Sequence, residues 1–110
     1  MTFLQPLACF FAGLFICNGI PHLTSGLRGE PFPSPFSKPP GRGLSSALVN
    51  SLWGSGNLLI GAILLWLGSF TPGPNVGSAC FAVGFILMGI PTSRHFEKVR
   101  LTRQKNETGE

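Results

Sequence analysis

The sequence predicts an all-α protein: a three-helix transmembrane bundle with a Pro/Gly-rich loop between its first and second helices. Hydrophobic residues make up 44% of the 110-residue chain and charged residues only 11%, whereas soluble domains are about 25% charged. Long apolar runs alternate with segments rich in proline, glycine or charge. The chain length allows one domain, so we expect a single integral membrane domain over 1–110.

The first predicted helix covers about 3–20 and contains the apolar run Leu7–Ile20. Its length of about 27 Å is close to the hydrocarbon core of a bilayer, about 30 Å. The alternative is a cleaved signal peptide, which needs a basic start and a small-residue cleavage site. No Lys or Arg precedes Arg28, and NGIPHLTSG is a poor cleavage site. We therefore predict a retained helix.

A loop is predicted over 21–43, on the cytoplasmic side, because this segment contains six prolines. Proline fixes φ and lacks an N–H, so we expect extended backbone rather than regular structure. Pro21 should end or kink the first helix. Phe32 and Phe36 should lie at the bilayer interface or against the end of the bundle. The alternative is that the loop is a lid or re-entrant segment over a cavity.

The second predicted helix covers about 44–70, lacks charge and proline, and should be the central helix of the bundle. Small residues recur in it every seven positions, at Ala47, Gly54, Gly61 and Gly68. Seven residues make almost two turns, so they share one face and predict close helix packing in lipid. We expect this face to receive small residues of both flanking helices, namely Ala12, Gly19, Ala82 and Gly89.

The third predicted helix covers about 76–93, after a tight turn at 71–75, and a cytoplasmic tail follows over 94–110. The segments 11–21 and 81–91 read FAGLFICNGIP and FAVGFILMGIP, with seven of eleven positions identical. The similarity has two alternative explanations, an internal duplication or a chance match between two apolar runs.

Positive charge predicts the orientation. With three crossings, all eight Lys and Arg residues fall on the side of the loop and the tail: Arg28, Lys38, Arg42, Arg94, Lys98, Arg100, Arg103 and Lys105. The positive-inside rule then places the amino terminus outside and the carboxyl terminus in the cytoplasm. We expect a multi-pass protein of a bacterial inner membrane.

Polar residues in the cytoplasmic half form a candidate polar pocket, consisting of Asn18, His22, Asn50, Ser51 and Asn57. The amides either hydrogen-bond between helices or line a functional site. A pH switch or metal pair at His22 and His95 is a further alternative, but two histidines make a weak site. We predict no metal, no cofactor and, without a nucleophile–base set, no enzyme.

The sequence GRGLSS precedes the second helix and supplies a candidate lipid-phosphate site, formed by Arg42, Gly43, Ser45 and Ser46. Free amides at a helix start attract anions, and Arg28 and Lys38 add positive charge nearby. The alternative is an ordinary helix start capped by Ser45 or Ser46.

The segments NGIPH, PFPSPF and GLSSALVNSLWG resemble a family of small, uncharacterised bacterial membrane proteins with NGIPH, FPxPF and GLSSxLVNxLWG segments. The resemblance covers roughly 18–57 and implies a bacterial inner-membrane location. It implies no activity or ligand. Ala47 stands where the family pattern has proline, which leaves the helix start less rigidly defined.

These features predict a non-enzymatic assembly or accessory module that contacts anionic lipid and forms a homo-oligomer or binds another membrane protein. The alternative is an oligomeric small-solute transporter or channel that uses Asn18, Asn50 and Asn57. A membrane enzyme is a third possibility. Nucleic acid is not an expected partner, because no helix-turn-helix, zinc or aromatic–basic pattern occurs in the sequence.

Overall fold

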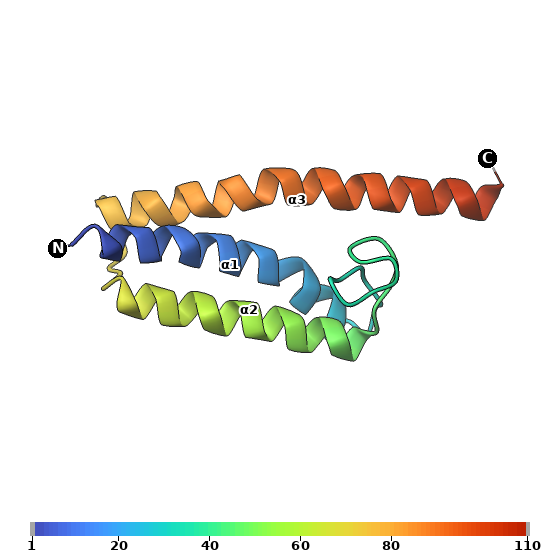
Figure 1. Ribbon diagram of the computed structural model, residues 1–110, viewed down its shortest axis with the longest axis horizontal. Helices are drawn as coiled ribbons and strands as arrows, with labels where there is room; N and C mark the ends of the chain where they lie inside the picture. Colours follow the sequence, from blue (N-terminus) through green and yellow to red (C-terminus); the bar gives the residue numbers. More distant parts are fainter. Residues whose placement is uncertain (1, 110) are drawn as a thin grey trace.

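The computed structural model describes residues 2–109, and it contains three α-helices side by side (Figure 1). They are α1 (Leu4–Leu27), α2 (Ala47–Leu67) and α3 (Val76–Thr108), and no strand occurs among the described residues. The helices α1 and α3 run parallel, and α2 runs antiparallel to them. Each helix is long and apolar enough to cross a membrane. The predicted fold class, a three-helix transmembrane bundle, is confirmed.

The central helix is α1, and the prediction that 44–70 forms the central helix is wrong. α1 packs on both α2 and α3, whereas α2 and α3 make no packing contact with each other (Figure 1). The reason is that α1 has small residues on two faces. Ala12 and Gly19 are buried toward α2, and Gly13 is buried toward α3.

Backbone-to-backbone approach holds α2 against α1. A β-carbon added to Gly54 would lie 2.5 Å from the backbone nitrogen of Leu23. One added to Gly61 would contact the Ile16 side chain, and one added to Gly68 would lie 2.8 Å from the carbonyl oxygen of Gln5. Near the start of α2, the Ala47 carbonyl lies against Gly26 of α1. The seven-residue small face of α2 therefore lies along α1.

Two glycines bring α3 equally close to α1. A β-carbon added to Gly13 would lie 2.7 Å from the Phe85 nitrogen, and one added to Gly84 would meet the Phe10 carbonyl oxygen. The expectation that Ala82 and Gly89 receive α2 is wrong, because α1 is the only helix on which α3 packs and Ala82 is exposed.

The helix α1 continues beyond Pro21, so its predicted end near residue 20 and the loop predicted over 21–43 are corrected. The loop is 28–46. The helix ends at Leu27, and Gly29, two residues further on, has a left-handed φ of 73°. There the Glu30 amide donates to the Ser25 carbonyl over 3.0 Å, a bond that closes helix ends. Beyond Pro21, α1 bends toward the start of α2 (Figure 1).

The other helix bounds also differ from the predicted 44–70 and 76–93. Ser46 caps α2, because its hydroxyl accepts a hydrogen bond from the Val49 amide over 3.2 Å. Asn75 caps α3 by accepting one from the Ser78 amide over 2.9 Å. Pro91 does not end α3, which extends through the predicted tail to Thr108. α3 therefore reaches past the other helices (Figure 1).

Replacing Gly84 by alanine should destabilise the protein, because the added methyl group meets the Phe10 carbonyl of α1. We expect a loss of about 1–3 kcal/mol in the free energy of unfolding, the usual cost of overpacking. Thermal unfolding in detergent measures it. Gly56→Ala is the matched control, since nothing lies within 4 Å of the added methyl group. Equal effects of the two substitutions would contradict the close α1–α3 contact.

Candidate functional site

The loop between α1 and α2 folds into a compact cap, which we call the loop cap (residues 28–46). Phe32 and Ser45 exchange backbone hydrogen bonds of 3.1 Å and 3.0 Å. The hydroxyls of Ser34 and Ser45 lie 2.6 Å apart and both side chains are buried. The Gly41 amide donates to the Ser34 carbonyl over 2.8 Å. Hydrogen bonds to serines thus order a segment whose prolines exclude helix and sheet.

Asn50 of α2 joins the loop cap to the membrane-spanning helices. Its side chain is fully buried, and Nδ2 donates to the carbonyl oxygen of Phe32 over 2.8 Å. Nδ2 also lies 3.3 Å and 3.1 Å from the carbonyl oxygens of Ser45 and Ser46. Because these carbonyls identify Nδ2 as the donor, Oδ1 faces Nδ1 of His22, 2.8 Å away. His22 therefore donates from Nδ1.

Four residues of the candidate polar pocket form two hydrogen-bonded pairs, and one member of each pair, Asn18 and His22, lines the same cavity. His22 pairs with Asn50, and one turn along α1 the Asn18 amide donates to Oδ1 of Asn57 over 3.1 Å. Asn57 Nδ2 donates to the Trp53 carbonyl of its own helix over 2.8 Å. The fifth predicted residue, Ser51, lies against Gly26 of α1. The amides therefore hydrogen-bond between α1 and α2.

Aromatic side chains connect the loop cap to α3. The ring centroid of Phe96 lies 4.7 Å from that of Phe32, 6.0 Å from that of His22 and 5.1 Å from that of His95. Beside them is a cavity of ≈ 470 Å³. It is lined by Asn18, His22, Ser34, Pro35, Pro40, Gly41, Trp53, Met88, Pro91, Thr92, His95 and Phe96. Across residues 2–109, no three His, Cys, Asp or Glu side chains group as metal ligands would.

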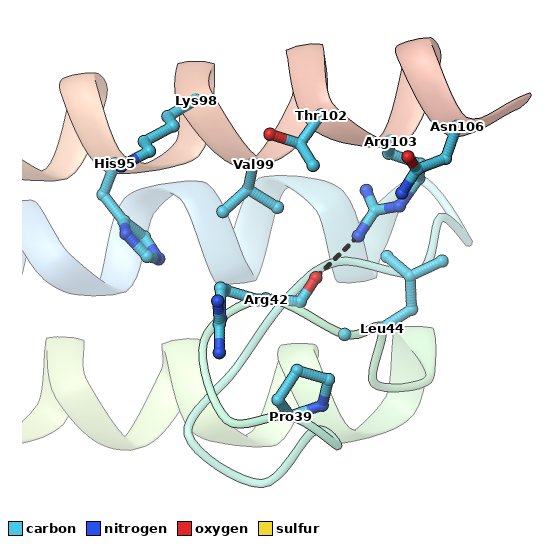
Figure 2. A pocket seen from close by; sticks show the side chains of 10 residues that line it. Pro39, Arg42, Leu44, His95, Lys98, Val99, Thr102, Arg103 and Asn106 are labelled. Carbon is cyan, nitrogen blue, oxygen red and sulfur yellow. Dashed lines mark hydrogen bonds between the residues drawn. The ribbon is translucent and has the colours of Figure 1, made fainter. Parts of the chain in front are cut away.

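A second, larger hollow of ≈ 630 Å³ lies between the loop cap and the polar part of α3, and we call it the basic groove (Figure 2). Its lining residues are Pro39, Arg42, Gly43, Leu44, His95, Lys98, Val99, Thr102, Arg103 and Asn106. Two hydrogen bonds hold its walls together. His95 Nε2 donates to the Gly41 carbonyl over 2.7 Å, and Arg103 donates to the Arg42 carbonyl over 2.8 Å.

The structure divides the candidate lipid-phosphate site. Arg42 and Gly43 line the basic groove, whereas Ser45 is buried against Ser34 and Ser46 caps α2. Arg28 pairs with Glu30, with 3.3 Å between Nε and Oε1. Only part of the GRGLSS sequence therefore faces a hollow.

Sequence reasoning missed the contribution of α3 to the basic groove. Its residues at 95, 98, 99, 102, 103 and 106 share one helical face. This spacing is visible in the sequence, but it becomes a signal only if the helix is continued beyond residue 93, where the predicted helix ends.

Comparison of the chain with family models, with curated proteins and with solved structures gives no match. The class of protein therefore follows from the fold alone. Three apolar helices of membrane-spanning length define a small, multi-pass integral membrane protein.

Asn50→Leu should release the loop cap, because it removes the bond to His22 and the contacts of Nδ2, whose two hydrogens are shared among three carbonyl oxygens. At about 1 kcal/mol per hydrogen bond, we expect a loss of about 2–4 kcal/mol in the free energy of unfolding. Trypsin cleavage after Arg42, followed by mass spectrometry, measures the release. Asn18→Leu is the control, because it removes one interhelical bond worth about 0.6 kcal/mol. An Asn50→Leu loop as resistant as wild type would contradict this role.

Proposed function

We propose that this membrane protein is a non-enzymatic accessory module of a bacterial inner membrane, with its amino terminus outside and its loop cap in the cytoplasm. In that orientation the loop cap and the polar, carboxyl-terminal part of α3 (residues 94–108) contact anionic lipid headgroups. The apolar helices contact further copies of the chain or another membrane protein.

One observation carries the proposal: all the basic residues gather at one end of the molecule. The loop cap and the carboxyl-terminal half of α3 contain all eight Lys and Arg residues, and they lie together at the end opposite the amino terminus (Figure 1). Positive charge of this kind is retained on the cytoplasmic side of a bacterial membrane and is attracted to anionic lipid.

Two further features support a binding role rather than catalysis. The buried amides of the helices hydrogen-bond to one another and to backbone, so they act as interhelical contacts. The outer faces of the helices carry exposed apolar side chains, among them Leu52, Leu59, Ile63, Trp66, Ile86 and Leu87. Lipid or a partner helix suits such faces.

Reporter fusions test the orientation on which this function depends. A reporter active only outside the cell should work at Asn75, in the turn before α3, because that turn lies at the end without basic residues. A reporter active only in the cytoplasm should work at the carboxyl terminus. Activity of the opposite reporter at either position would place the basic end outside and refute the proposal.

A further inference from the structure

The basic groove is lined by three Lys and Arg side chains and by no acidic side chain. Arg42 comes from the loop cap, and Lys98 and Arg103 come from α3 (Figure 2). Within residues 2–109, the sole ion pair joins Arg28 to Glu30, so the three cations of the groove remain available to an anion from outside.

Hydrogen bonds hold two of the groove's polar side chains, Arg103 and His95, in place before any ligand binds. Arg103 is half-buried and uses one N–H group on the Arg42 carbonyl, which leaves other guanidinium N–H groups for a ligand oxygen. His95 donates from Nε2 to the Gly41 carbonyl. In the neutral ring, Nδ1 is then an acceptor for a hydroxyl. The hydroxyl of Thr102 and the amide of Asn106 also line the groove.

The groove lies at the depth of lipid headgroups. The 21 residues of α2 give a length of about 31 Å, which matches the hydrocarbon core. The loop cap precedes the start of α2, so it lies just beyond the hydrocarbon. Apolar side chains remain at this level, because Leu44 is 49% exposed at the rim of the groove and Leu48 is 69% exposed on α2. A ligand held here by its phosphate can place acyl chains along these residues.

From this charge, depth and polarity, we propose that the basic groove is a binding site for an anionic phospholipid with a polyol headgroup, such as phosphatidylglycerol. Arg42, Lys98 and Arg103 bind the phosphate, and His95 accepts a hydrogen bond from a headgroup hydroxyl. A headgroup with an ammonium group is disfavoured, because no carboxylate lines the groove to pair with it. This inference rests on the proposed function and names the lipid and the site that serve it.

Lipid titration of the delipidated full-length protein, followed by native mass spectrometry, tests the site. The variant is Arg42→Gln with Lys98→Gln, because it spares the Arg103 hydrogen bond that holds the groove together. We expect its affinity for phosphatidylglycerol to fall about 25-fold, since each cation contributes to binding at an anionic headgroup. Wild type should retain phosphatidylglycerol in preference to phosphatidylethanolamine.

The matched control is Arg94→Gln with Arg100→Gln, which removes the same charge from α3 outside the groove. Its affinity should stay near that of wild type, and both variants should keep the wild-type unfolding temperature. Equal losses in the two variants would reduce the effect to general surface charge and overturn the site. So would unchanged binding in the groove variant.

Competition with water-soluble phosphates distinguishes a lipid from a free anion. Inorganic phosphate and glycerophosphoglycerol should displace phosphatidylglycerol only weakly, because neither carries acyl chains. Displacement by either compound at the affinity of the lipid would assign the groove to a soluble phosphate and refute the lipid proposal. These results do not depend on the reporter fusions, so the site and the membrane orientation can fail separately.

Discussion

Close backbone contact along α1 is the constraint on which the rest of the structure depends. Lipid supplies no hydrophobic force that favours helix association, so the helices need van der Waals contact and hydrogen bonds. Gly13 and Gly84 give that contact toward α3, and Gly54 and Gly61 give it toward α2. Because these contacts use two different faces of α1, one helix can hold two neighbours that do not pack on each other.

The same packing positions the candidate site. The contact between α1 and α2 places His22 beside Asn50, and Asn50 in turn fixes the backbone of the loop cap. The loop cap then meets α3 through Gly41 and Arg42, whose carbonyls accept hydrogen bonds from His95 and Arg103. The basic groove thus forms between two segments that are distant in sequence. A substitution at Gly13 or Gly84 that shifts α3 should therefore also change the shape of the basic groove.

The sequence predicts the helices well and their neighbours poorly. Long apolar runs give the three spans, and the seven-residue spacing gives the packing face of α2, because both are local patterns. The packing of α3 on α1 depends on the contact between Gly13 and Gly84, which are distant in sequence, so no local pattern predicts it. The first and third helices are predicted to end near residues 20 and 93, yet they continue to Leu27 and Thr108. The residues with which α3 lines the basic groove therefore fall in the predicted tail, 94–110.

Cysteine crosslinking tests most directly whether α1 lies between its neighbours. A β-carbon at position 68 lies 2.8 Å from Sγ of Cys9, and one at position 89 lies 3.5 Å from Sγ of Cys17, within reach of a disulfide. With Cys80 replaced by serine, oxidised Gly68→Cys should link α2 to Cys9 and Gly89→Cys should link α3 to Cys17. Mass spectrometry of the peptides identifies each link, and Gly56→Cys should remain free. A Gly89→Cys that stays free while Gly68→Cys links would contradict the central position of α1.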